Sequence, residues 1–280
     1  MNFCLRIVTP LVVLLSPCWA DADRVRQVLI SALNDEVPTI PTSDQQKLID
    51  AARDLKPDEL RSLLPLGMAC LQSSHGSARR AGVALFRGAS ENSSASVLLE
   101  PYVSDFADCL KVPSCFYRGW IVLWLVPTIY SPKPSEAAAA ALIANLEDEP
   151  YPESNDPIAA SALLENFPND LLMRRRVLNF VQRKSDGLLT MEVVGSLRKV
   201  DQFSSEDLAF IRSCLADDDD PWVVAATINM LAKIDSNVRE QFVERLKAMA
   251  AEPQANDVRT ALENFFEQVS PPHESNASKP

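Results

Sequence analysis

Glycine and histidine are scarce in this sequence, whose 280 residues include only 7 Gly and 2 His. Scarce glycine argues against glycine-rich phosphate loops and tight β-hairpins, which need backbone conformations that other residues avoid. Two histidines supply few metal ligands and few bases that titrate near neutral pH. The composition therefore disfavours phosphate-loop chemistry and most metal-dependent or base-dependent chemistry.

Short catalytic motifs and excess positive charge are also missing. No His-x-x-x-His, Cys-x-x-Cys or Gly-x-Ser-x-Gly pattern occurs, so zinc sites and hydrolase nucleophile elbows lack their residues. Lys and Arg number 27 against 38 Asp and Glu, giving a formal net charge of −11. A surface of this sign repels phosphate backbones and argues against nucleic-acid binding. We expect a protein without enzymatic activity and without catalytic, cofactor-binding or metal-binding residues.

Proline and apolar residues are plentiful. The 20 prolines suit the starts of helices and the turns between them, which favours a protein of many short helices. Hydrophobic residues make up 47% of the chain, enough for a substantial core. The segment at Asp220 shows the pattern best: Asp220 is a good N-cap, Pro221 suits the first helical position, and apolar residues follow to Ile234 at helical spacing.

The same pattern recurs along the chain. Asp156-Pro157 begins a matching segment, a further helix is expected near Leu188, and the theme returns at Asp257. Other amphipathic segments precede these and similar ones; they span residues 57–72, 96–110, 135–146, 170–181, 205–215 and 238–249.

These Asp-Pro helix starts resemble the second helix of HEAT or armadillo-type repeats, and the resemblance covers residues 57–268. It implies an all-α fold, a right-handed α-solenoid of about six antiparallel helix pairs with a period of roughly 31 to 42 residues. Trp120 and Trp124 depart from the pattern, since repeats usually have small residues there. We expect the solenoid to span residues 23–269, after a signal peptide at 1–22 and before a disordered tail at 270–280.

The amino terminus has the pattern of an export signal. Arg6 precedes an apolar run at residues 7–15, far shorter than the roughly 20 residues of a membrane span. Small residues at Ala20 and Ala22 predict cleavage after Ala22, while Cys18 and Ala20 offer a second choice. We expect a periplasmic or secreted protein with no membrane span. The alternative is a lipoprotein anchored through Cys18, although Pro17 departs from the lipoprotein cleavage box.

Export would place the remaining cysteines in an oxidising space, where disulfides persist. Cys109 and Cys115 flank a turn-prone segment that can bring their Cα atoms within bridging range. A Cys109–Cys115 disulfide and two buried small side chains are both consistent with this pattern. Cys70 and Cys214 lie on apolar helical faces, so we expect them to fill the core.

Several other groups have a functional and a structural interpretation. The run Asp217–Asp220 lacks the ligand spacing of a calcium loop, so we favour a solvated turn that caps a helix. Arg174–Arg176 is interpreted as a solvated face, with one Arg lining an anion-binding groove as the alternative. Residues 120–126 are apolar on every side and predict a buried central helix; exposed, they would form a partner-binding patch.

The remaining candidates are weaker. His75 and His273 are expected to be solvated, the first in a turn and the second in the tail. Asn92 and Asn276 head glycosylation sequons that matter only in a eukaryotic secretory route. Residues 149–155 form a long loop that either shapes a binding surface or is a tolerated insertion.

Together these features predict an exported, non-enzymatic HEAT-like scaffold without a cofactor, which binds a protein or peptide partner. The alternatives are a HEAT-like lyase or chaperone-type enzyme, because some HEAT-like repeat proteins attach bilin pigments, and a lipid-anchored envelope protein.

Overall fold

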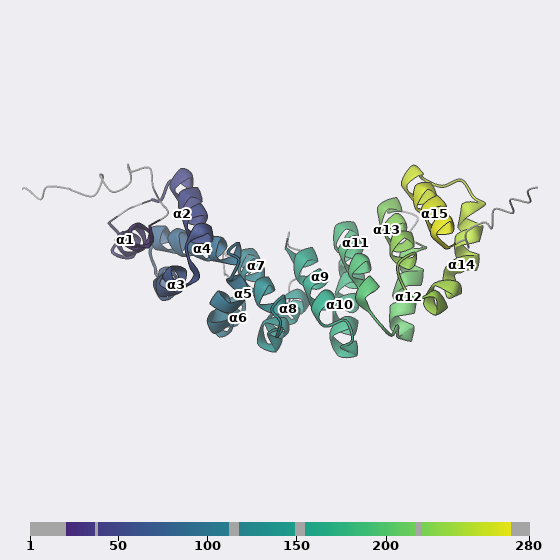
Figure 1. The fold of residues 1–280 in the computed structure, drawn as a ribbon, viewed down its shortest axis with the longest axis horizontal. Helices are drawn as coiled ribbons and strands as arrows, with labels where there is room; N and C mark the ends of the chain where they lie inside the picture. The colour runs from purple at the N-terminus through teal and green to yellow at the C-terminus, as the bar shows by residue number, and fades with distance from the viewer. Residues whose placement is uncertain (1–20, 37–38, 112–117, 149–154, 217–219, 270–280) are drawn as a thin grey trace, which may run out of the picture. The chain divides into compact units, whose positions relative to one another are not determined.

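A computed structural model of the chain describes residues 21–36, 39–111, 118–148, 155–216 and 220–269. All regular secondary structure in these residues is helical, with no β-strand among them (Figure 1). The all-α prediction is therefore confirmed. The chain forms two compact units that divide between Ala138 and Ala139, inside helix α8 (Glu136–Asp148). Each unit is described separately below.

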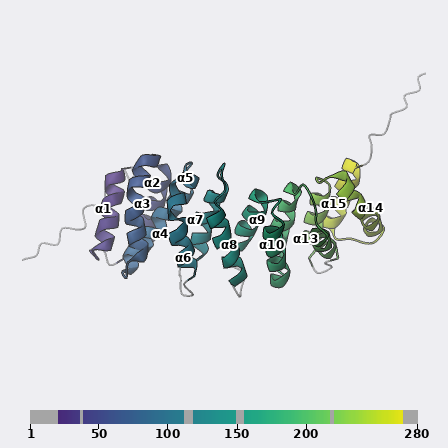
Figure 2. The ribbon, with the colours of Figure 1, turned by 90° about the horizontal axis from the view of Figure 1, so that it is seen from below.

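Unit 1 is organised around helix α4, which packs against α1, α2, α3, α5 and α7 (Figures 1 and 2). The elements of this unit are α1 (Ala22–Leu33), α2 (Thr42–Asp54), α3 (Pro57–Gln72), α4 (Gly76–Ser90), α5 (Ala95–Leu99), the 3-10 helix η2 (Glu100–Tyr102), α6 (Val103–Leu110) and α7 (Arg118–Ile129). Helix α1 begins at Ala22 and is capped by Asp21, whose carboxylate accepts the backbone N–H of Asp23 at 3.0 Å.

Glycines on α4 allow neighbouring backbones to approach it closely. A Cβ at Gly82 would lie 2.9 Å from the carbonyl oxygen of Gly67 in α3. A Cβ at Gly88 would overlap the carbonyl oxygen of Ile49 in α2. Because the helix surface is flat at these two positions, α2 and α3 can both lie against α4 without a side chain between the backbones.

The core of unit 1 contains a cluster of aromatic rings. Phe86 of α4 contacts Phe106 of α6 edge-on, with ring centroids 5.2 Å apart, and Trp124 of α7 lies 5.3 Å from each of them. Trp124 is fully buried, so the prediction of a buried helix at residues 120–126 is confirmed for this side chain. Helix α7 passes Pro127 and ends at Ile129, two residues later than the sequence suggested.

The amphipathic segment predicted at 96–110 is helical in the structure but consists of three elements. The structure divides it into α5, η2 and α6 around Pro101. Proline has no N–H and its ring clashes with the preceding helical turn, so the α-helical hydrogen bonds are interrupted there. The 3-10 turn that carries Pro101 joins the two short helices.

Unit 2 contains two sets of helices that alternate along the chain. In one set α9, α11, α13 and α15 pack side by side in chain order, and in the other α10 packs against α12 (Figure 1). The bounds are α9 (Asp156–Asn166), α10 (Leu171–Lys184), α11 (Gly187–Ser196), the 3-10 helix η3 (Leu197–Lys199), α12 (Ser205–Cys214), α13 (Pro221–Leu231), α14 (Ser236–Ala250) and α15 (Asn256–Val269).

Helix α13 begins as the sequence predicts. The Asp220 carboxylate accepts the backbone N–H groups of Trp222 and Val223 at 3.1 and 3.3 Å, and Pro221 occupies the first helical position. Asp156 itself occupies the first position of α9, where it is fully buried and Asn155 is the N-cap. The two Asp-Pro starts therefore both mark helix starts, with the boundary shifted by one residue.

Among the described residues, no helix is both long enough and apolar enough to cross a membrane. The predicted tail at 270–280 and the signal residues 1–20 lie outside the described residues.

Candidate functional site

Three exposed apolar side chains lie in the first turns of α9, α11 and α13. Ile158, Leu188 and Trp222 are 45%, 57% and 65% exposed, and each lies two residues after an aspartate. Because α9 packs against α11 and α11 against α13, the three side chains belong to one edge of unit 2. We call them the apolar row.

Trp222 is held in place although it is exposed. Its indole Nε1–H donates a hydrogen bond to Oδ2 of Asp257, the second residue of α15, at 2.9 Å. The bond fixes the ring between two neighbouring helices and leaves most of its surface accessible to solvent. A fixed aromatic ring loses little conformational entropy when a ligand covers it, which is the property of an interface anchor.

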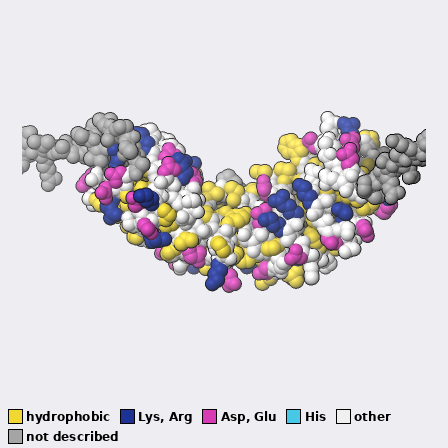
Figure 3. All heavy atoms as spheres, in the orientation of Figure 1, with side chains coloured by type: hydrophobic (Ala, Val, Ile, Leu, Met, Phe, Trp, Pro, Cys, Tyr) yellow, Lys and Arg dark blue, Asp and Glu magenta, His cyan; other side chains and the backbone are white. Residues whose placement is uncertain are grey.

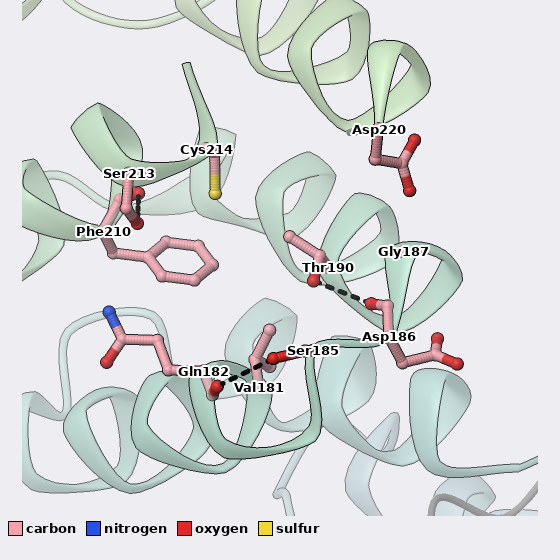
Figure 4. A pocket seen from close by; sticks show the side chains of 10 residues that line it. All are labelled: Val181, Gln182, Ser185, Asp186, Gly187, Thr190, Phe210, Ser213, Cys214 and Asp220. Carbon is pink, nitrogen blue, oxygen red and sulfur yellow. Dashed lines mark hydrogen bonds between the residues drawn. The ribbon is translucent and has the colours of Figure 1, made fainter. Parts of the chain in front are cut away.

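Two carboxylates flank the row. Asp186 accepts the backbone N–H of Leu189 at 2.7 Å and caps α11, as Asp220 caps α13. Gly187 lets these two turns meet, since a Cβ at this position would overlap Oδ2 of Asp220. Figure 4 shows both carboxylates turned to the same side, away from Phe210 and Cys214.

Behind the two caps lies a cavity of about 660 Å³. Its walls come from the end of α10, the starts of α11 and α13, and the last turn of α12, where Phe210 and Cys214 lie (Figure 4). The cavity is within the size range of small-ligand pockets. Its wall combines the apolar Phe210 and Val181 with hydroxyl groups of Thr190 and Ser213.

Gln182 on α10 also lines two smaller hollows. One, of about 470 Å³, lies beside Glu147, Asn179 and Arg183; the other, of about 380 Å³, extends towards α12. Figure 3 shows Lys and Arg side chains gathered over α10 and α11. The surface of α10 is therefore a polar and partly basic groove, different in character from the apolar row.

The interpretation of Arg174–Arg176 as a solvated face is wrong for Arg174, whereas Arg175 is exposed and Arg176 is partly exposed. Arg174 is buried and donates to both carboxylate oxygens of Asp207 in α12, at 3.2 and 2.9 Å. The other two arginines form two-point ion pairs in opposite directions, Arg175 with Glu206 and Arg176 with Glu147. The arginines diverge around α10, as expected, but an acidic residue on a neighbouring helix meets each of them.

The ion pair with Arg176 has an electrostatic consequence for Glu147. Hydrogen bonds from the Arg176 guanidinium lower the pKa of the Glu147 carboxyl, and the charges of Arg176 and Arg183 act in the same direction. Glu147 therefore stays ionised well into the acidic range and compensates positive charge in the groove. The two paired arginines have less capacity to bind an external anion than their number suggests.

The histidines and the acidic run do not form a site among the described residues. His75 is in the turn before α4, where its Nδ1 lies 3.5 Å from Oδ1 of Asp35, while His273 lies outside the described residues. Asp217–Asp219 also lie outside them, and Asp220 acts as a helix cap. No group of three or more His, Cys, Asp or Glu among the described residues is arranged to hold a metal ion.

The cysteines follow the sequence interpretation where the structure describes them. Cys70 and Cys214 are buried, as predicted, and burial raises the pKa of the Cys70 thiol to about 12. Cys109 lies near the end of α6, but Cys115 is outside the described residues, so the Cys109–Cys115 disulfide stays a prediction.

Asn92 has a structural role that the sequon did not indicate. Its side-chain amide is buried and donates to the carbonyl oxygens of Arg53 and Leu55, at 2.8 and 3.0 Å. These bonds tie the end of α4 to the end of α2, so this amide nitrogen is occupied in the folded chain. Asn276, the second sequon residue, lies outside the described residues.

Sequence reasoning missed the apolar row. A signal was present, because aligning the Asp156, Asp186 and Asp220 starts places an apolar residue two positions later each time. Helical spacing identifies those residues as apolar, but their exposure depends on whether a neighbouring helix covers them.

Comparisons of this chain with protein-family models, with curated proteins and with solved structures found no match.

Proposed function

We propose that this protein is an exported, non-enzymatic scaffold of HEAT-like helical repeats that binds a protein or peptide partner. In this proposal the repeats form a right-handed α-solenoid of about six antiparallel helix pairs. The order of packing in unit 2 supports it, because α9, α11, α13 and α15 each contact the next helix of the same set. Stacked two-helix repeats produce such an order.

The apolar row is the observation that carries the binding function. An exposed, fixed tryptophan in line with Leu188 and Ile158 exposes apolar surface that water solvates poorly. Apolar residues that gather on a surface, rather than lie scattered singly, mark interaction sites. Aromatic side chains are also the residues that contribute most binding free energy at protein interfaces.

A selection from a random peptide library tests this function. Folded wild-type protein is the bait, and the counter-bait is the double variant Leu188→Ser/Trp222→Ser. The matched control is Leu172→Ser, which removes an equally exposed leucine (66%) from the first turn of α10, at the opposite end of the helix layer. Circular dichroism and thermal unfolding establish that all three proteins are folded before selection.

We expect enriched peptides that bind the wild type and Leu172→Ser equally and lose at least about tenfold in affinity for the double variant. If no sequence is enriched, or if the enriched peptides bind all three proteins alike, the proposal that this surface binds partners is wrong.

A further inference from the structure

We infer that the apolar row binds an extended, positively charged peptide segment with an apolar residue at every third position. This inference rests on the proposed binding function and specifies the partner's chemistry. The spacing of the row, the carboxylates beside it and the ion pairs in the basic groove on α10 support this inference.

Spacing determines the periodicity of the ligand. Packed helices lie roughly 8 to 10 Å apart, so consecutive members of the row are separated by about that distance. A polyproline-II segment rises about 3.1 Å per residue with three residues per turn, which places residues i, i+3 and i+6 on one face about 9 Å apart. A β-strand directs residues i and i+3 to opposite faces, so it fits the row less well.

Charge determines the residues between the apolar positions. Asp186, Asp220 and Asp257 lie beside the row, and each uses one carboxylate oxygen for a helix cap or for the Trp222 indole. The second oxygen of each accepts no hydrogen bond from the described part of the chain. Glu192, one helical turn after Leu188, adds another exposed carboxylate. Lys or Arg side chains of a ligand would complement these groups.

Nearby basic side chains are directed elsewhere. The Lys184 ammonium lies over the Phe180 ring, 5.5 Å from its centroid. Arg183 lines the hollow beside Glu147, on the far side of α10 from α12. A third basic side chain, Arg259 near Asp257, donates to the side-chain oxygen of Asn256 at the start of α15.

Two other occupants fit less well. An acidic segment could approach the groove on α10, but Arg175 and Arg176 there are already held in two-point ion pairs. A second copy of this chain would bring together two proteins that each carry a net charge of −11. A cationic segment avoids both conflicts.

Three synthetic twelve-residue peptides with blocked ends test the inference by fluorescence anisotropy. The first contains four Leu-Lys-Pro triplets, which favour polyproline II and place leucine at every third position. The second has the same composition with the leucines adjacent, and the third has Glu in place of Lys. The proteins are the wild type, Leu188→Ser/Trp222→Ser, and the control Leu172→Ser.

A further protein variant removes the charge alone. Asp186→Asn/Asp220→Asn/Asp257→Asn keeps a side-chain oxygen for both caps and for the indole, because Asn is also a good N-cap. Its matched control is Asp235→Asn, the N-cap of α14 at the other end of α13. Salt titration completes the set, since exposed charges are screened over about 8 Å at physiological ionic strength.

We expect the Leu-Lys-Pro peptide to bind the wild type and both controls alike, and to bind at least about tenfold more weakly to the double Ser variant. The triple Asn variant should also bind it more weakly, and the salt dependence should be reduced. If the Glu or adjacent-leucine peptide binds the row equally well, this inference is wrong while the scaffold function stands. If none of the three peptides binds, the inference is again wrong, and the library selection decides the scaffold function independently.

Discussion

Arg174 and Asp207 form a buried two-point ion pair that joins α10 to α12, with 1% and 2% of their side chains exposed. The remaining donors and acceptors of the pair are also satisfied. Arg174 donates to the carbonyl oxygens of Pro168 and Gln202, and Asp207 accepts from the backbone and hydroxyl of Ser204 at the start of α12. The pair therefore links α10 to α12 and caps α12 at the same time.

Removing one partner of this pair should strongly destabilise unit 2. Asp207→Asn keeps the cap geometry but leaves the Arg174 guanidinium without a counter-charge, and we expect a loss of about 3–5 kcal/mol in the free energy of unfolding. Arg174→Met/Asp207→Leu should recover part of that loss because no unpaired charge remains. Urea denaturation measures both. The control is Arg175→Gln, which breaks an exposed pair and should change stability little; equal effects of Asp207→Asn and Arg175→Gln would contradict the buried role.

The same substitution should have opposite effects at two glycines. Gly88→Ala places a Cβ against the Ile49 carbonyl, so α2 and α4 must separate, at about 1–3 kcal/mol of stability. Gly195 lies inside α11 with open space where a Cβ would be. Gly195→Ala should therefore stabilise by about 0.5–1 kcal/mol through helix propensity. Thermal unfolding measures the sign of each stability change. If both substitutions destabilise the protein, the close approach of α2 to α4 is not the reason for glycine at position 88.

Cys70 should make stability depend on pH in the alkaline range. Its folded pKa is raised to about 12 by burial, whereas a thiol in the unfolded chain titrates near 9.0. The contribution is thus fully present below about pH 9 and is lost as pH rises towards 12, because the unfolded chain releases a proton that the folded chain retains. We expect the wild type to lose about 1 kcal/mol more than Cys70→Ala between pH 8 and pH 10. Parallel pH profiles for the two proteins would contradict this account.

The capping of α1 favours the second cleavage choice, after Ala20, over the predicted cleavage after Ala22. Cleavage after Ala22 would remove both Asp21, the cap of α1, and the first helical residue, whereas cleavage after Ala20 keeps them. An N-cap contributes about 1 kcal/mol to helix stability. We expect the mature chain to begin at Asp21, which intact-mass measurement on protein from a periplasmic fraction would show. A chain that begins at Asp23 contradicts the cap argument, and one that begins at Met1 contradicts export.

The sequence predicted features that depend on short stretches of chain. The start of α13 could be predicted because Asp220 caps N–H groups within three residues of it and Pro221 suits the first helical position. The burial of Trp124 was readable because its segment is apolar on every side. Helix capping and the burial of an all-apolar helix both depend on residues that are close together in the sequence, so they can be predicted from it.

What escaped prediction depends on partners distant in the sequence. Arg174 and Asp207 are far apart along the chain, and the residues next to each of them in the sequence do not indicate that the two will form an ion pair. Asn92 resembled a surface sequon because its acceptors, at the end of α2, lie in another helix. The exposure of the apolar row was not predicted, because periodicity records which side chains are apolar and says nothing about whether a neighbouring helix covers them.

The hydrogen bond between Trp222 and Asp257 ties the exposed ring to the last helix that the structure describes. Helices with few packed neighbours open most readily. A ligand that covers the ring would favour the state in which α15 is docked. Binding of a ligand at Trp222 would therefore protect α15 from proteases. Limited proteolysis could then detect bound ligand without labelling the protein or the ligand.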